Sequence, residues 1–161
     1  MTTYVTKWSD AGGSGNTINA DAAGDLIRNV YEIDLSIAPF KGVTFGVGDI
    51  IDMGAIPANH RVADMVVVSD QLDTNGTPLL AFDVGVLTGT VGDTVNARTM
   101  GTEFFAASTL ARAGGTARLA LTTGFLVSPT YKDQSIGVKV TAAAATLATT
   151  GKLRLMVSMT G

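Results

Sequence analysis

Residues 61–87 read RVADMVVVSDQLDTNGTPLLAFDVGVL, two β-patterned runs separated by a turn. The first run, residues 61–69, is apolar and β-branched toward its end, which is typical of a well-buried strand. The second, residues 79–87, alternates apolar with small or acidic residues, which indicates a strand with one face in a core. Asn75-Gly76 between them is the strongest short hairpin dipeptide, because both residues tolerate positive φ. We therefore predict that the two runs are antiparallel partners joined by this turn. If Gly76 sits at positive φ, a β-branched residue there should cost about 1–3 kcal/mol.

The acidic residues of this connection also raise the question of a calcium loop. An EF-hand loop needs alternating oxygen ligands, a glycine at its sixth position and a glutamate at its twelfth. Counted from Asp73, the sixth residue is Pro78 and the twelfth is Val84, so the pattern fails. We instead expect Asp70 and Asp73 to accept hydrogen bonds from backbone N–H groups of the loop.

The rest of the chain repeats the same short-period patterning. Further strands are predicted near residues 31–37, 49–53, 116–127, 134–141 and 151–159. The best helix candidate is 102–114, with Thr102 as its cap and Gly114 or Gly115 as its end. The small apolar segment 142–150 is expected to be a connection. Seven or eight short strands separated by turn signals favour an all-β antiparallel sandwich or barrel with at most one or two short helices.

Composition limits the classes of protein that this chain can be. Its 161 residues fit one domain, and only 16% of them are charged, well below the usual quarter. Such a chain has either a large core or a surface partly hidden against partners. With a net charge of −3 and no dense Lys/Arg stripe, we expect no nucleic-acid partner. No apolar run reaches the length of a bilayer span and no signal-peptide pattern is found, so we expect no membrane partner and assembly in a cytoplasm.

Candidate catalytic groups are sparse. The chain has no cysteine and one histidine, His60, so neither a zinc site nor thiol catalysis can be assembled. No G-x-S-x-G elbow accompanies His60, and the glycines of 11–16 lack the context of a phosphate-binding loop. We predict no catalytic residue, no cofactor and no metal, hence no enzyme. The carboxylates that could serve as an acid–base pair are expected on the wet faces of strands: Asp49, Asp52, Asp64 and Asp83.

The N-terminal segment differs in composition from the rest. Residues 1–20 are rich in Thr, Gly, Ser and Asn, and AGGSGN at 11–16 is typical of a flexible joint. Tyr4 and Trp8 precede this joint, and they either fold back on their own domain or dock on a neighbouring subunit. We predict a flexible arm over 1–20, a single domain over 21–161, and a subunit or capsid interface that uses Tyr4 and Trp8 as anchors.

Four segments resemble a family of tailed-phage virion proteins. They are GDIIDMGAIPANHRV from Gly48, SDQLDTNGTP from Ser69, the FDVG strand from Phe82, and YKDQSIGV from Tyr131 with the residues that follow it. Members of the family are placed among capsid decoration (cement) proteins with a jelly-roll-like β-sandwich. The resemblance therefore implies that fold and a place on the virion. Residues 1–40 match no part of the pattern.

The resemblance also implies a structural function without catalysis. A decoration protein would bind the major capsid protein and itself, as a homotrimer or alternatively a dimer, and stabilise the head by many linked weak contacts. It would be assembled in the host cytoplasm and reside on the capsid surface. Two alternatives stay open. One is another virion component, such as a head fibre base or a tail protein, and the other is a carbohydrate-binding β-sandwich module, which would need an aromatic-lined cleft.

Overall fold

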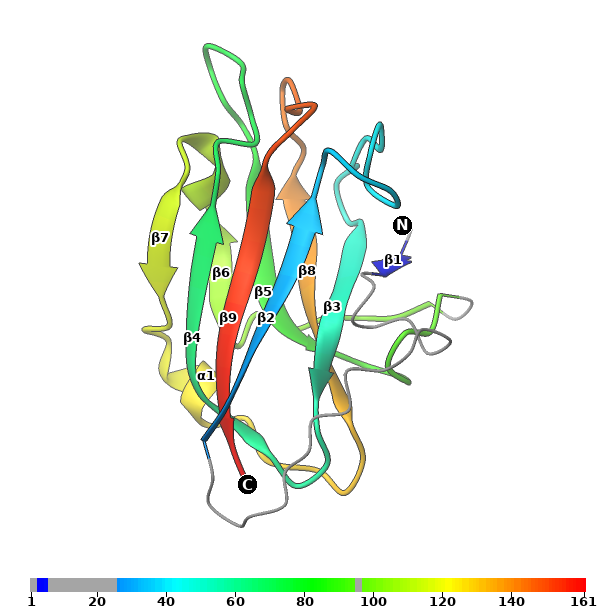
Figure 1. The fold of residues 1–161 in the computed structure, drawn as a ribbon, viewed down its shortest axis with the longest axis vertical. Coiled ribbons are helices and arrows are strands. Elements are labelled where there is room, and N and C mark those ends of the chain that lie inside the picture. Colours follow the sequence, from blue (N-terminus) through cyan, green and yellow to red (C-terminus); the bar gives the residue numbers. More distant parts are fainter. Residues whose placement is uncertain (1–2, 6–25, 95–96) are drawn as a thin grey trace.

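The computed structural model describes residues 3–5, 26–94 and 97–161, the first three as backbone only. In this part of the chain, nine strands form two sheets packed face to face (Figure 1). The five-stranded sheet has the order β1-β3-β8-β5-β6 and the four-stranded sheet the order β2-β9-β4-β7. The strands are β1 (Thr3–Val5), β2 (Leu26–Asp34), β3 (Ile50–Ile56), β4 (Arg61–Ser69), β5 (Ala81–Leu87), β6 (Phe105–Ser108), β7 (Gly115–Arg118), β8 (Gln134–Ala142) and β9 (Lys152–Thr160). One turn of 3-10 helix (Leu110–Arg112) and the four-residue α1 (Thr122–Phe125) complete the described elements.

The strand order is that of a jelly roll. Apart from β1, the eight strands are all paired antiparallel. Each connection from β2 to β9 crosses between the sheets, except β5–β6. Two four-stranded sheets linked in this way are the eight-stranded double Greek key of jelly rolls. The expected all-β, jelly-roll-like sandwich is confirmed.

The core lies between the sheets and follows from two-residue alternation. Tyr31 and Ile33 of β2 are buried, whereas Val30 on the opposite face is 43% exposed. Full burial of a large apolar side chain stabilises the folded state by about 1.5–3 kcal/mol. The apolar face of each alternating strand therefore turns toward the core. The strand predicted near residues 31–37 lies earlier in the chain, because β2 spans Leu26–Asp34 and Ile37 is exposed in the turn that follows. Other members of the core include Ile51, Met53, Met65, Val67, Phe82, Val84, Ile136, Val138, Leu155 and Val157.

The predicted hairpin is wrong, although both of its strands exist. β4 lies in the four-stranded sheet between β9 and β7, and β5 lies in the five-stranded sheet between β8 and β6. The Asn75-Gly76 connection therefore crosses from sheet to sheet. Gly76 is not among the described glycines with positive φ, so the condition for strain from a β-branched residue there is not met.

The helix predicted over 102–114 is also wrong. Phe105–Ser108 form β6, which pairs with the edge of β5, and only Leu110–Arg112 are helical. The free edge of β5 needs backbone partners, and Asp83 anchors the segment by accepting a 2.7 Å hydrogen bond from the N–H of Ala107. Tertiary pairing thus overrides a helix-like composition.

The strand predicted over 116–127 is correct only at its start. β7 ends at Arg118, and α1 begins at Thr122. The Thr123 hydroxyl donates a 2.8 Å hydrogen bond to the carbonyl of Glu103, which draws this part of the chain away from the sheet. The segment 142–150 is a connection without helix, as predicted.

The arm is described only at β1. Its backbone pairs in parallel with β3 of the same chain, with Tyr4 opposite Ile51. The remaining arm residues, Trp8 among them, and the expected domain boundary at residues 20/21 lie outside the described residues. The division into arm and domain therefore stays a prediction.

Candidate functional site

Asp73 holds together one end of the sandwich. It lies in the connection from β4 to β5, its side chain is fully buried, and both of its carboxylate oxygens accept backbone hydrogen bonds. The donors are the N–H groups of Asn75 (3.3 Å), Leu79 (2.7 Å), Leu80 (3.1 Å), Ala145 (3.0 Å) and Thr146 (3.0 Å). Because two donors belong to the connection from β8 to β9, one carboxylate joins two crossings between the sheets.

The electrostatics of Asp73 follow from these donors. Burial alone raises the pKa of a carboxyl, but the N–H groups of Thr146 and Leu79 and their neighbours more than offset it and hold the pKa of Asp73 far below its usual range. Asp70 accepts a 2.9 Å bond from the N–H of Lys152. The expectation of donors from the loop is confirmed for Asp73, whereas the donor to Asp70 is the first residue of β9 and not part of the loop.

His60 occupies a turn and not a catalytic array. It follows Asn59, whose φ is 62°, in the connection from β3 to β4. Its Nδ1 lies 2.8 Å from the carbonyl oxygen of Ala58. This contact stabilises the turn. Within the described ranges, no three His, Cys, Asp or Glu residues cluster as ligands for a metal ion.

The four strand carboxylates are bound, but three of them are not on wet faces as expected. Asp49, Asp52 and Asp83 are buried. Asp49 accepts a 2.9 Å bond from the N–H of Gly46, and Asp83 holds β6 as described above. Only Asp64 is partly exposed, and it pairs with Arg118 at 2.9 Å. For Asp52, the physical reason is that Gly92 and Arg98 of the connection from β5 to β6 bind its carboxylate on the outer face of the five-stranded sheet.

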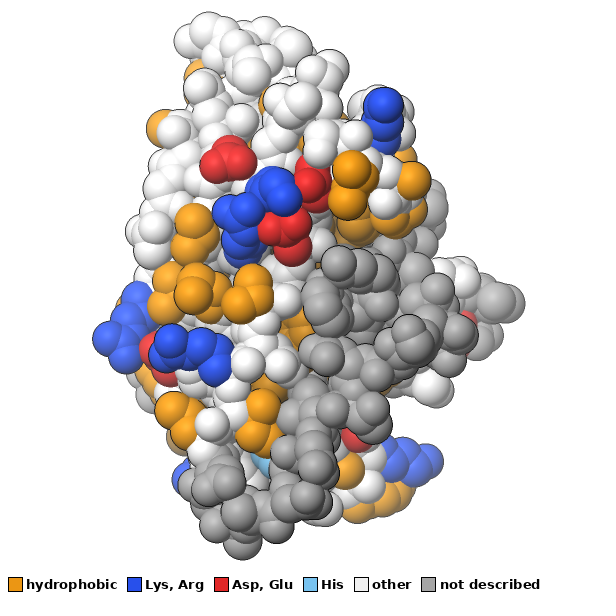
Figure 2. All heavy atoms as spheres, in the orientation of Figure 1, with side chains coloured by type: hydrophobic (Ala, Val, Ile, Leu, Met, Phe, Trp, Pro, Cys, Tyr) orange, Lys and Arg blue, Asp and Glu red, His pale blue; other side chains and the backbone are white. Residues whose placement is uncertain are grey.

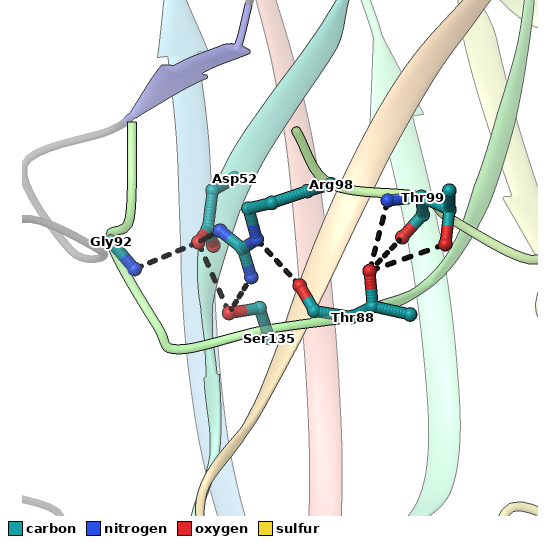
Figure 3. Close-up of polar contacts among 6 residues, drawn as sticks. All are labelled: Asp52, Thr88, Gly92, Arg98, Thr99 and Ser135. Atoms are coloured by element: carbon teal, nitrogen blue, oxygen red, sulfur yellow. Dashed lines mark hydrogen bonds and ion pairs between the residues drawn. The ribbon is translucent and has the colours of Figure 1, made fainter. Parts of the chain in front are cut away.

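A buried ion pair fastens that connection to the sheet (Figure 3). Arg98, 1% exposed, donates from Nη1 to Asp52 of β3 at 2.5 Å and from Nη2 to the Ser135 hydroxyl of β8 at 2.7 Å. Its Nε donates to the carbonyl of Thr88 at 2.7 Å. The N–H of Gly92 also donates to Asp52, at 2.9 Å. Three segments, namely β3, β8 and the connection from β5 to β6, therefore meet at one guanidinium.

Burial raises the pKa of Asp52, and the Arg98 guanidinium with the Gly92 N–H limits that rise. Sequence reasoning missed this cluster, since Arg98 and Asp52 are 46 residues apart and neither stands in a motif. The glycines beneath the connection are a weak signal that a second layer lies there. A Cβ on Gly85 would come within 2.1 Å of the carbonyl oxygen of Gly101.

The outer face of the four-stranded sheet is open by contrast. Strand register places Val30, Met156 and Val66 side by side in one row across β2, β9 and β4. Val30 is exposed, and the other two are partly buried. Figure 2 shows this face, with hydrophobic side chains between two groups of charged ones.

The charged groups on this face are paired within the chain. On one side of the row, Lys152 contacts Glu32 at 2.9 Å and Asp34 at 2.8 Å, and Arg154 contacts Glu32 at 2.6 Å. Lys152 and the hydroxyl and N–H of Ser36 hold the pKa of Asp34 at about 2. The two carboxylates in turn raise the pKa of Lys152. At the β7 end of the row, Arg118 stands opposite Val66 and pairs with Asp64. On the other side of the row, Arg28 donates from Nε to the Ser158 hydroxyl at 3.3 Å.

The two predicted interface anchors are not brought together in the described residues. Tyr4 lies on β1 at the edge of the five-stranded sheet, and Trp8 is outside the described ranges. Their role in an interface stays a prediction. No helix among the described residues is long and apolar enough to cross a membrane.

Comparison with known proteins places this fold among phage capsids. No protein-family model matches the chain, and no curated protein matches it. Among solved structures, a chain of "Capsid of Ralstonia phage GP4" is 34% identical with a TM-score of 0.87, over 99% of this chain and 97% of that one. A chain of "Cyanophage Pam1 capsid asymmetric unit" is 26% identical with a TM-score of 0.64, over 86% of both chains. A third, from the acidic stable capsid of Helicobacter pylori bacteriophage KHP30, is 12% identical with a TM-score of 0.51, over 85% of this chain and 92% of that one, and shows the fold alone.

Proposed function

From the premise that this chain belongs to a family of tailed-phage virion structural proteins, we propose that it is a capsid decoration protein. It binds the major capsid protein on the outside of the head and stabilises the shell. The observation that carries the proposal is the near-complete match, at 34% identity, to a chain of a solved phage capsid.

The geometry supports a rigid, non-catalytic role. Buried polar groups are engaged in holding connections: Asp73 binds five backbone N–H groups, and Arg98 fastens the connection from β5 to β6. A decoration protein needs such rigidity, because each weak contact adds to the next only if the sites keep their spacing. We therefore propose that the chain is not an enzyme and requires no cofactor, metal, nucleic acid or membrane.

The partners proposed are the major capsid protein and further copies of this chain. The arm, with Tyr4 and Trp8, extends the contact beyond the sandwich, and assembly takes place in the host cytoplasm. Large aromatic side chains are the residues that most often dominate interface energies. Joined through a glycine-rich segment, they can reach a neighbouring molecule without moving the sandwich.

The test is binding to heads that lack the protein. Purified chain is added to such heads, and the particles are pelleted and examined by electron microscopy. Saturable binding on the shell, together with a higher temperature of DNA release, is the expected result. Binding confined to the tail or to a head fibre would instead assign the chain to another virion component, and the absence of binding to particles would refute the proposal.

A further inference from the structure

The tip of the connection from β4 to β5 places an asparagine directly before a glycine. Asn75 and Gly76 are both exposed, in a loop that projects beyond the ends of the strands (Figure 1). No other asparagine of the sequence precedes a glycine. A Cβ on Gly76 would meet nothing within 4 Å outside its chain neighbours, so solvent reaches this part of the backbone. Because glycine has no Cβ to shield its nitrogen, the backbone N–H of Gly76 is open to reaction.

The Asn75 side chain makes two contacts that suit the loss of its amide group. Its Oδ1 accepts a 2.9 Å hydrogen bond from the N–H of Thr77, and its Nδ2 donates to the Thr146 hydroxyl at 3.1 Å. A backbone N–H aimed at a carbonyl oxygen stabilises the negative charge that develops there when the carbon is attacked. The Thr146 hydroxyl lies at the nitrogen that would leave. Since Thr146 is exposed, this hydroxyl can exchange protons with water.

We propose that Asn75 converts spontaneously to aspartate and isoaspartate in the folded protein, and that these contacts assist the reaction. The Gly76 nitrogen loses its proton to solvent and attacks Cγ of Asn75, which forms a C–N bond and closes a cyclic imide. The bond from Cγ to Nδ2 then breaks, and ammonia leaves with a proton passed on by the Thr146 hydroxyl. Water opens the imide at either of its two ring C–N bonds and gives aspartate or isoaspartate. The reaction consumes water alone, so it requires no cofactor and no enzyme.

The products of this reaction act on the contacts of Asp73. The N–H of Asn75 donates to the Asp73 carboxylate, and both side chains contact Thr146. A carboxylate at residue 75 therefore places a second negative charge near the buried one, and like charges disfavour each other's ionised form. Isoaspartate also lengthens the backbone by one carbon between the donors at Asn75 and Leu79. The converted chain should therefore be less stable, since Asp73 joins two crossings between the sheets.

The first test follows the conversion by peptide mass spectrometry on the full chain, incubated in its folded state at mildly alkaline pH. Asn59 is the internal control, because it is exposed in a turn but precedes His60, whose side chain hinders the attack. Asn75 should gain the mass of an acid at least about tenfold faster than Asn59. The rate should rise with pH, because the Gly76 nitrogen attacks without its proton. An isoaspartate-specific methyltransferase distinguishes the two products.

The second test separates the effect of the glycine from that of the fold. Gly76→Ala adds a Cβ where there is room, so the variant should fold and convert at least about tenfold more slowly. Thr146→Val keeps the backbone N–H that donates to Asp73 but removes the hydroxyl that contacts Nδ2. This variant should convert several-fold more slowly. The unsubstituted chain in concentrated urea gives the rate without the fold, which should be no faster than the rate in the native state.

Three outcomes would overturn the proposal. One is a native chain in which Asn75 converts several-fold more slowly than in urea, which would show that the contacts protect the amide. Another is conversion in Thr146→Val that is as fast as in the unsubstituted chain or faster. The third is equal conversion at Asn75 and Asn59.

The effect on stability is measured by comparing fresh with aged protein. Aged protein should melt at a lower temperature, and Asn75→Asp should reproduce part of that loss. Unchanged melting of fully converted protein would refute the effect on the Asp73 contacts. Since the reaction needs no capsid, each of these results leaves the decoration role untouched.

Discussion

Asp73 shows how one buried carboxylate can replace a turn motif. The connections from β4 to β5 and from β8 to β9 would each leave backbone N–H groups buried at this end of the sandwich, and unsatisfied donors are costly. A single carboxylate accepts from both connections. The acidic residues that suggest a calcium loop in the sequence thus bind the protein's own backbone.

Asp73→Asn should destabilise the protein by about 2–4 kcal/mol, because the amide removes the charge and turns an NH₂ group toward N–H donors. Asp70→Asn is the matched comparison, since Asp70 accepts from one backbone N–H, that of Lys152. Its loss should be about 1 kcal/mol or less. Urea unfolding at neutral pH measures both. Equal losses for the two variants would contradict the role given to Asp73.

The low pKa of Asp73 also predicts how stability depends on pH. The unfolded carboxyl protonates near pH 3.9, whereas the folded one stays ionised to far lower pH. The unfolded state therefore binds more protons as the pH falls, and stability present above pH 4 is lost progressively below it. Asp34, with a folded pKa of about 2, acts in the same direction. Denaturant midpoints measured from pH 5 to pH 2 should fall, and should fall less steeply in Asp73→Asn. Parallel curves for the two proteins would assign the acid sensitivity to other groups.

At the scale of elements, the layer over the five-stranded sheet depends on close backbone approach. Gly85→Ala would place a methyl group 2.1 Å from the carbonyl oxygen of Gly101, so one backbone must move. Overpacking of this kind costs about 1–3 kcal/mol. Gly76→Ala is the control, because nothing lies within 4 Å of its Cβ and its φ is not positive. It should be neutral or raise stability by up to about 1 kcal/mol. Thermal melts of the two variants test the pair, and a Gly85→Ala chain as stable as Gly76→Ala would mean that the layer is not closely packed.

The same layer depends on Arg98. Arg98→Met leaves Asp52 buried without its cation, which should cost about 3–5 kcal/mol. The double variant Asp52→Val with Arg98→Met removes both charges and should be less destabilised than the single one. Limited proteolysis of the connection from β5 to β6 should accelerate in Arg98→Met first. If the single variant lies within 1 kcal/mol of the wild type, the ion pair does not hold the layer.

The local sequence pattern predicted where strands lie better than it predicted which strands pair. Runs such as 61–69 and 151–159 alternate clearly, and both became strands close to the expected bounds. Their pairing is a property of the whole jelly roll, in which consecutive strands mostly lie in different sheets, so Asn75-Gly76 could not reveal it. The segment 102–114 failed for a related reason, because the edge of β5 decides its conformation. The Arg98 cluster and the row of Val30, Met156 and Val66 depend on register between distant strands, which no local signal carries.

At the scale of the whole molecule, the two outer faces are unlike. The face of the five-stranded sheet is covered by the chain's own connection, with Arg98 buried beneath it. The face of the four-stranded sheet is open, and its charges are paired on either side of an apolar row (Figure 2). A chain with only 16% charged residues therefore combines a closed side with a side suited to contact. This asymmetry is consistent with the proposed role on a capsid shell.

The structure of the sandwich does not determine the role of the N-terminal arm. Deletion of residues 1–16 tests that role. Every described strand except β1 begins at Leu26 or later, so the shortened chain should fold with nearly the melting temperature of the full chain. We expect its occupancy on heads, or its self-association, to fall at least about tenfold, since aromatic anchors carry much of an interface's energy. Trp8→Ala alone should give part of that loss. A shortened chain that binds and associates like the full one would refute an intermolecular role. A shortened chain that does not fold would show instead that the arm completes its own domain, where β1 covers the edge of β3 from Ile50 to Asp52.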